Sequence, residues 1–577
     1  MKFIHVYNED YFEGLEKNGL INKDTGFKIQ HVFCMEEELK FNKLAAKGGK
    51  LHSLLKEGRH PFYIDRVCGG TTYHKYDFDK SLIDEYQNLL GDWFLGFQLH
   101  ESGSNRRSEW KTILEAMDGK PGPYDPEALK KALVNPIATT PEGKELYKLS
   151  QDLPEVYATM RYAETYGEYM EEMKDMFRRR MEEVNGLVLP CDSYFLATKL
   201  QDEMGIKTFM PEVGCQIAMM RIEVALVRGI AKASGKTWGT YYECWRELRE
   251  NGTAYYSMPC YNTDPSNEWH LSQSQHPDDF TSFGENGGSS RLLQNRIYHY
   301  ALMSGADYVA EEWGLNCSYT DMQEFTLSDY GKVKKDFINA ALDFQGIRAE
   351  VPFAVVLPKA YSCIEITDMF MDYQLGHHRD TYLYTPISAE EKQYIGHVED
   401  VLKLIFNREG DGIGNEGHVI TNSRFGDVFD IIYEDASDEV FAKYAYLIDA
   451  TPEGSFAAKR KDLRVLESSD LEKLTAELSK RIPEVMPCYV DDLCWLVSYD
   501  ESGRRYLSIF NNEGNERSLE KGDIIHREAD CPVTIKLNQA GELKVLKEAS
   551  GAVNLEKADD VTYHATIPAA GFAIFEF

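Results

Sequence analysis

The sequence lacks the long apolar segments and paired cysteines that define several classes of protein. No apolar run reaches the roughly 18–20 residues that a membrane helix needs. Asn8, Glu9 and Asp10 interrupt the amino-terminal stretch before it resembles the apolar core of a secretory signal. The 11 cysteines are scattered and include no CxxC pair, which argues against a zinc ribbon and a disulfide framework. We therefore expect reduced thiols and a cytoplasmic location.

Basic residues are also scarce relative to acidic ones. The chain has 63 Lys and Arg against 95 Asp and Glu, a net charge of −32 at pH 7. A field of this sign repels nucleic-acid phosphates and anionic membranes, so we expect neither as a partner. A neutral substrate is indifferent to this charge, and the surplus carboxylates also keep a chain soluble.

The first 350 of the 577 residues alternate short apolar runs with helical stretches. Helices are expected at 80–90, over most of 105–185, and at 216–233. No glycine-rich phosphate fingerprint follows the first expected strand, which weakens an open dinucleotide-binding sheet. Repeated βα units over this length predict an α/β fold with a (β/α)8 TIM barrel at 1–350. Its expected strands lie at 62–67, 93–100, 187–190, 207–210, 237–242, 254–258 and 306–310.

Two further domains are expected after the barrel. A helix at 332–344 leads to apolar strands at 352–358, 428–432 and 446–449, which predict a small α/β domain over 351–485. From residue 486 the pattern changes to period-two alternation, as at 506–510, 533–537 and 571–575. This alternation predicts an antiparallel β-sandwich over 486–577.

Acidic residues end an unusual number of the expected barrel strands. The active site of a parallel barrel lies at the carboxyl ends of its strands. Glycosidic bond cleavage needs two carboxyl groups there, one to protonate the leaving oxygen and one to attack carbon or activate water. Aromatic rings and amides that suit sugars lie in nearby segments, including Gln98, Tyr241 and Tyr242. The strand-end residues are Asp65, His100, Glu101, Asp192, Glu212, Glu243, Glu311 and Glu312.

Each of these acids has a structural interpretation as well. A single strand-end acid often caps the next helix or pairs with a buried cation, and Asp65 and Asp192 fit such roles. Acids at six strand ends favour a shared site over six separate caps. His377 and His378 have no matching ligand set, and the glycine-rich stretch 410–417 has too few oxygen ligands for calcium. We therefore predict no metal and no cofactor.

Several segments resemble a known group of enzymes. Residues 210–214, 225–231, 235–239 and 289–314 resemble barrel segments of clan A glycoside hydrolases. The order of barrel, small α/β domain and β-sandwich is similar to that of the family 42 β-galactosidases, whose middle domain mediates trimer formation. The resemblance implies a glycosidase and a homo-oligomer. The chain departs from the family at Pro211, because the family has Asn before its acid/base Glu.

The sequence thus predicts a glycoside hydrolase that cleaves a neutral glycosidic bond with a pair of glutamates. Glu212 is the expected general acid/base and Glu312 the expected nucleophile, with Glu243 as the rival for that role. We expect retention, for which the two carboxyls lie about 5–5.5 Å apart; a separation of about 6.5–9.5 Å would indicate inversion. The expected substrate-binding residues are Asp65, His100, Glu101, Asn105, Trp245, Tyr261, Asn262, Glu311 and Trp313.

Two other functions stay open at this point. A non-catalytic carbohydrate-binding protein on a degenerate barrel would use the same rim without a close pair of acids. A metal-dependent lyase or isomerase would need several converging His and Asp side chains, and the strand ends offer only His100. The sugar and its anomeric configuration also stay open.

Overall fold

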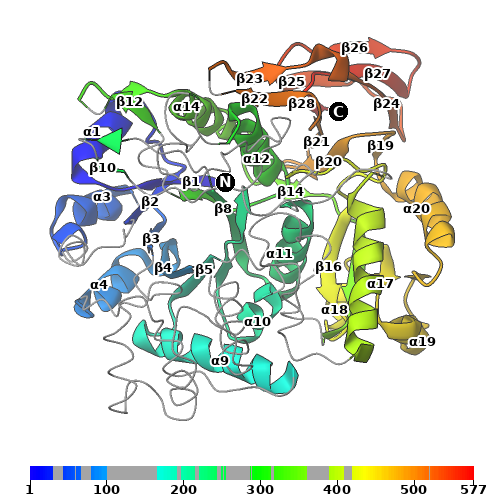
Figure 1. Ribbon diagram of the computed structural model, residues 1–577, viewed down its shortest axis with the longest axis horizontal. Helices are drawn as coiled ribbons and strands as arrows, with labels where there is room; N and C mark the ends of the chain where they lie inside the picture. The colour runs from blue at the N-terminus through cyan, green and yellow to red at the C-terminus, as the bar shows by residue number, and fades with distance from the viewer. Residues whose placement is uncertain are drawn as a thin grey trace, which may run out of the picture.

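The amino-terminal part of the chain forms a nearly closed barrel of parallel strands (Figure 1). The strands are hydrogen-bonded in the order β5-β4-β3-β2-β1-β11-β8-β6, with β7 also beside β8. β6 and β7 are two short segments of one strand position, separated by Met210 and Pro211, so the barrel has eight positions. The strands are β1 (Lys2–Val6), β2 (Thr25–Ile29), β3 (Phe62–Ile64), β4 (Phe94–His100), β5 (Val188–Cys191), β6 (Thr208–Phe209), β7 (Glu212–Gly214), β8 (Thr237–Glu243) and β11 (Tyr308–Glu312).

The computed structural model describes most of the chain but not all of it. The described residues are 1–29, 43–58, 60–65, 79–100, 166–191, 197–214, 220–243, 249–250, 253–254, 286, 289–312, 318–321, 323–359, 389–408, 419–518 and 520–577.

The predicted (β/α)8 barrel is present, but two of its strands differ from the expected set. β1 and β2 were not predicted. The strand expected at 254–258 is wrong as a barrel strand, because Thr253–Ala254 (β10) pairs antiparallel with Arg249–Glu250 (β9) in a separate two-stranded sheet. The remainder of that expected strand, 255–258, lies outside the described residues.

Amphipathic helices surround the barrel strands. Two of them start at a serine N-cap, since Ser290 accepts from the Leu293 N–H and Ser328 from the Gly331 N–H. No helix in the described part of the chain combines the length and the apolar content needed to span a bilayer. The helices are α1 (Glu9–Lys17), α3 (Lys50–Gly58), α4 (Ser81–Leu90), α9 (Tyr166–Glu183), α10 (Ala197–Glu203), α11 (Met220–Ser234), α12 (Arg291–Met303) and α14 (Asp329–Ala341).

A second parallel sheet follows the barrel, in the order β16-β15-β17-β18. Its central strand reads FAVVL and is buried along its whole length, as expected for a parallel strand covered on both faces. The strands are β15 (Phe353–Leu357), β16 (Phe429–Tyr433), β17 (Tyr446–Asp449) and β18 (Val465–Glu467). The helices are α17 (Ala389–Phe406), α18 (Asp438–Phe441), α19 (Ser455–Lys459) and α20 (Leu471–Val485).

Antiparallel sheets form the carboxyl-terminal part of the chain, as the period-two alternation predicted. The largest contains β14 (Arg348–Ala349), β20 (Cys494–Tyr499), β21 (Arg505–Phe510), β28 (Phe572–Glu576) and β25 (Lys544–Ala549). The second contains β19 (Cys488–Val490), β24 (Cys531–Leu537), β27 (Thr562–Ile567) and β26 (Asn554–Lys557), and β22 (Asn515–Ser518) pairs with β23 (Gly522–Ile525). β14 precedes the α/β sheet in sequence, yet it pairs with β20, so the chain crosses between these units.

Two barrel helices join the barrel to the later sheets. On α11, the Arg228 guanidinium donates to Asp430 of β16 (2.6 Å) and to Asp427, which precedes this strand (3.3 Å). Gly229 lies so close to β16 that an added Cβ would stand 2.3 Å from the Ile431 carbonyl oxygen. On α12, the buried Arg296 donates to Asn512 (3.0 Å) near the end of β21. Charged and close-packed contacts therefore fix these units to one another, and Figure 1 shows α11 beside β16.

Candidate active site

The inner face of the barrel is defined by a separate cluster of buried side chains. Successive side chains of a strand point to opposite faces. The inner cluster comprises Ile4, Tyr63, Leu95, Leu189, Cys191, Met210, Tyr241, Tyr308 and Ala310. Their neighbours Ile64, Phe209 and Val309 belong instead to the core shared with the helices. Alternation therefore places Asp65, Glu212 and Glu312, each two residues beyond an inner-cluster member, on the inner face near the carboxyl ends.

Asp65 lies in a buried polar cluster inside the barrel. It accepts from the Lys28 ammonium (2.9 Å) and from the Tyr241 hydroxyl (3.2 Å). Lys28 also lies 4.6 Å from the centre of the Tyr241 ring. Both charged side chains are fully buried, and pairing them offsets the large cost of removing each charge from water. The strand-end acid Asp65 is thus held by a lysine of the neighbouring strand β2.

Gln98 and Cys191 extend this cluster. With its amide nitrogen turned toward Asp65, Gln98 donates to that carboxylate. Burial raises the pKa of the Cys191 thiol well above its usual range, and the negative charges of Asp65 and Glu312 raise it further. A hydrogen bond with Gln98 acts in the opposite direction. Glu312 and Asp65 therefore both lie within electrostatic reach of one thiol, although they come from strands β11 and β3.

Glu212 and Glu312 are both buried near the carboxyl end of the barrel. Glu212 opens β7 and is fully buried, and Glu312 ends β11 with 3% of its surface exposed. Strand β8 lies between them, with Tyr241 paired to Glu212 and Glu243 paired to Glu312. Three acidic positions thus occupy three neighbouring strand positions at the same end of the barrel.

The backbone places two further predicted residues at this end. Glu243 is the last residue of β8 and pairs with Gly214 of β7 as well as with Glu312. His100 is the last residue of β4 and pairs with Cys191 of β5. Both positions therefore lie at the level of the inner acids.

Glu311 occupies a different environment from its neighbour Glu312. Its carboxylate pairs with the Lys334 ammonium of α14 at 2.5 Å and accepts from the Tyr298 hydroxyl of α12. Lys334 also donates to Ser318 at 2.7 Å. These contacts hold Glu311 between the strands and the helices, on the opposite face of β11 from Ala310.

The other predicted site residues lie outside the described residues, namely Glu101, Asn105, Asp192, Trp245, Tyr261, Asn262 and Trp313. The residue that the sequence analysis missed is Lys28. Its signal was weak, because Lys28 lies in a short run, TGFKI, that was not predicted as a strand. Within the described ranges, no group of three or more His, Cys, Asp and Glu side chains is arranged to hold a metal ion.

No family model and no curated protein sequence matches the chain. Among solved structures, α-L-fucosidase isoenzyme 2 from Paenibacillus thiaminolyticus aligns with 100% of this chain and 99% of its own, at 10% identity and a TM-score of 0.46. An α-amylase from H. orenii aligns over 71% of this chain and 58% of its own, at 8% identity and a TM-score of 0.23.

A debranching enzyme from Nostoc punctiforme covers 100% of this chain and 98% of its own, at 11% identity and a TM-score of 0.21. All three similar structures are glycoside hydrolases. None of them is described as a family 42 β-galactosidase. Because every TM-score is below 0.5, these similarities carry no argument about the activity of this chain, and its function is inferred from its own residues.

Proposed function

We propose that the chain is a glycosidase that cleaves a neutral glycosidic bond at the carboxyl end of its barrel. The observation that carries this proposal is the presence of buried carboxylates on the inner face, Glu212 and Glu312, on either side of β8. Hydrolysis of a glycoside uses two such groups on opposite sides of the scissile bond.

In the proposed reaction, Glu212 protonates the glycosidic oxygen and Glu312 attacks the anomeric carbon. The bond to the leaving alcohol breaks as the bond to the Glu312 carboxylate oxygen forms. A water molecule then gives a proton to Glu212 while its oxygen attacks the anomeric carbon, which breaks the bond to Glu312 and releases the sugar with its original configuration. Glu243 is the rival for the role of nucleophile, since it is paired in register with Glu312.

The polar cluster beside these acids is proposed to bind sugar hydroxyls. Asp65 and Gln98 supply acceptors and a donor, and the ion pair with Lys28 fixes the position of the Asp65 carboxylate. The proposed set also includes His100, Glu101, Asn105, Trp245, Tyr261, Asn262 and Trp313. Glu311 is left out of it, because Lys334 and Tyr298 hold its carboxylate on the helix side of β11.

Glutamine substitutions test the assignment with little change in side-chain volume. We expect Glu212→Gln to lower turnover of the best nitrophenyl glycoside by about 10²–10⁴-fold, the range for loss of a catalytic proton donor or acceptor. Glu312→Gln removes the attacking carboxylate and should lower turnover at least as much. Glu311→Gln is the adjacent comparison, and the loss of turnover per folded molecule should be small. Normal turnover in both Glu212→Gln and Glu312→Gln would overturn the assignment.

Family 42 membership, a homo-oligomeric state and a cytoplasmic location stay part of this proposal. A sedimentation mass equal to one chain would remove the oligomer. Turnover of a panel of nitrophenyl glycosides identifies the preferred sugar.

A further inference from the structure

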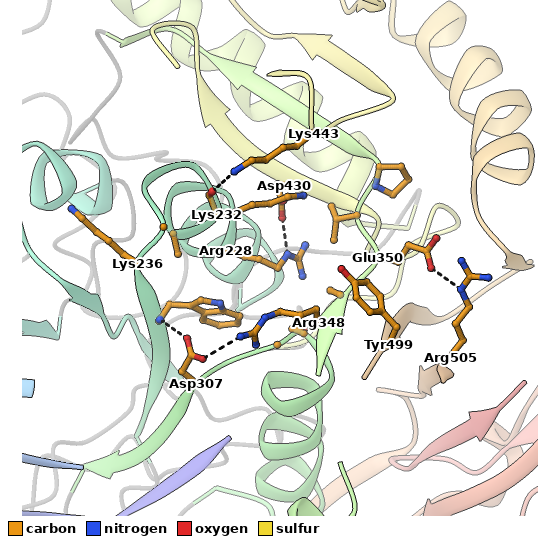
Figure 2. A pocket seen from close by; sticks show the side chains of 18 of the residues that line it. Arg228, Lys232, Lys236, Asp307, Arg348, Glu350, Asp430, Lys443, Tyr499 and Arg505 are labelled. Atoms are coloured by element: carbon orange, nitrogen blue, oxygen red, sulfur yellow. Dashed lines mark hydrogen bonds and ion pairs between the residues drawn. The ribbon is translucent and has the colours of Figure 1, made fainter. Parts of the chain in front are cut away.

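A cavity of about 890 Å³ lies at the opposite end of the barrel from the acidic strand ends. It is bounded by Trp238 at the start of β8 and by Asp307, which precedes β11. Asp430 and Lys443 of the α/β unit form a second wall, and Tyr499 and Arg505 of the antiparallel sheet form a third (Figure 2). All three structural units of the chain thus contribute to one cavity.

Positive charge dominates the wall of this cavity, although the chain as a whole is strongly acidic. Six cationic side chains line it against three carboxylates, in a protein of net charge −32. The cations are Arg228, Lys232, Lys236, Arg348, Lys443 and Arg505, and the carboxylates are Asp307, Glu350 and Asp430.

Three of the cations are paired with carboxylates and have little to offer a ligand. Arg228 is buried and donates to both Asp427 and Asp430. Lys236 donates to Asp202 at 2.6 Å, and Arg505 pairs with Glu350 at 3.2 Å (Figure 2). These three residues fix the walls of the cavity.

The other cations are held more loosely. The Lys443 ammonium donates to the backbone oxygen of Lys232 at 2.8 Å, and no carboxylate within the described residues forms an ion pair with it. Lys232 lies 3.4 Å from Asp430, a carboxylate already engaged by Arg228. Arg348 is 58% exposed and 3.9 Å from Asp307, the limit for an ion pair. Three cations from three walls are therefore available to a bound anion.

We propose that this cavity binds a small phosphate-bearing anion, held by Lys232, Lys443 and Arg348. The guanidinium group presents a planar fork that matches two phosphate oxygens, and ammonium groups bind phosphate as point charges. A dianion suits several separated cations better than a single carboxylate does. The ring of Tyr499, 41% exposed, offers an apolar wall for the organic part of a phosphate ester.

Two consequences follow from such binding. Burial lowers the pKa of the Lys232 ammonium. A bound dianion would act in the opposite direction, because a nearby negative charge favours the charged form of the lysine. A ligand that contacts α11, the α/β unit and β14 would also stabilise the folded chain in proportion to its occupancy of the site. The site lies away from the proposed catalytic acids, so its test is independent of hydrolysis.

The experiment is isothermal titration calorimetry on the full chain in low-salt, phosphate-free buffer. The probes are inorganic phosphate, glycerol 3-phosphate, succinate and glycerol, none of which is a sugar. We expect saturable binding of a phosphate probe at one site per chain, and no saturable binding of succinate or glycerol. Tighter binding of glycerol 3-phosphate identifies an ester as the ligand class, and equal or tighter binding of inorganic phosphate identifies the free ion.

Variants then locate the site. Arg348→Gln/Lys443→Gln should weaken phosphate binding at least tenfold, and Lys443→Gln alone, an exposed change that leaves folding intact, should weaken it measurably. Lys461→Gln/Lys544→Gln removes the same charge from exposed positions elsewhere and should leave affinity unchanged. The proposal is overturned if neither phosphate binds, if succinate or glycerol binds as tightly, or if Lys443→Gln and the double variant bind like the wild type.

Discussion

Charged side chains differ in burial and in ion-pair distance between the two ends of the barrel. Inside the carboxyl end, Lys28 and Asp65 are fully buried and make a close ion pair. In the cavity at the amino end, Arg348 is more than half exposed and lies at the limit of ion-pair distance from Asp307. A buried charge is strongly dependent on its partner, whereas an exposed charge is stabilised by water. Charge in the interior thus constrains the fold, and charge in the cavity remains available to a ligand.

The largest expected effect on stability is at Lys28. Lys28→Met removes one partner of a buried ion pair and leaves the Asp65 carboxylate without its cation. We therefore expect a loss of about 3–5 kcal/mol in the free energy of unfolding. Urea denaturation followed by circular dichroism measures it. Lys443→Met makes the same change in the cavity and should alter stability by less than about 0.5 kcal/mol.

Equal effects of these two substitutions would remove the contrast between the two regions. A further variant, Lys28→Met/Asp65→Leu, removes both charges. It should recover part of the loss, since replacing a buried pair by apolar groups is often close to neutral.

Strands made only of apolar residues could be predicted from the sequence, whereas the strand that carries the buried Lys28 could not. β15 and β17 were predictable because their residues are apolar without interruption. β2 was not, because Gly26 and Lys28 break its apolar pattern, and the carboxylate that neutralises Lys28 lies 37 residues further along the chain. A single sequence does not reveal such a partner.

The candidate site was predictable to a similar extent. The rule that acids end barrel strands pointed to Glu212, Glu243 and Glu312, and the structure places all three backbones at one end of the barrel. The sequence did not distinguish Glu311 from Glu312, because the orientation of Glu311 depends on Lys334. This lysine belongs to α14, a helix that follows β11 in the sequence. The catalytic roles themselves remain predictions.

A smaller effect on stability is expected where α11 of the barrel packs against β16 of the α/β unit. Gly229→Ala would place a Cβ against the Ile431 carbonyl oxygen, a backbone atom with little room to move, so we expect a loss of about 1–3 kcal/mol. Gly396→Ala is the matched control, because α17 has open space at that position. It should be neutral or stabilising by up to about 1 kcal/mol. Similar thermal midpoints for the two variants would contradict the close packing of α11 on β16.

The last prediction concerns the chemical labelling of two thiols, Cys531 and Cys191, and involves no change in stability or activity. Burial raises the pKa of Cys531, which is partly exposed, to about 11, and raises the pKa of the fully buried Cys191 well above its usual range. Only the thiolate reacts, so iodoacetamide labelling of Cys531 should rise about tenfold per pH unit between pH 8 and 10. Peptide mapping should find Cys191 unlabelled until the chain is unfolded in urea. Labelling of Cys191 in the folded chain would show that the barrel interior is open to solvent and reagent.

The central claim is that Glu212 and Glu312 act on opposite sides of one glycosidic bond. Azide rescue of Glu212→Ala and Glu312→Ala tests it most directly, using the dinitrophenyl glycoside that corresponds to the preferred nitrophenyl substrate. We predict that azide restores turnover in both variants, with a glycosyl azide of retained configuration from Glu212→Ala and of inverted configuration from Glu312→Ala. Wild-type cleavage of the same glycoside without any glycosyl azide from either variant would contradict the account.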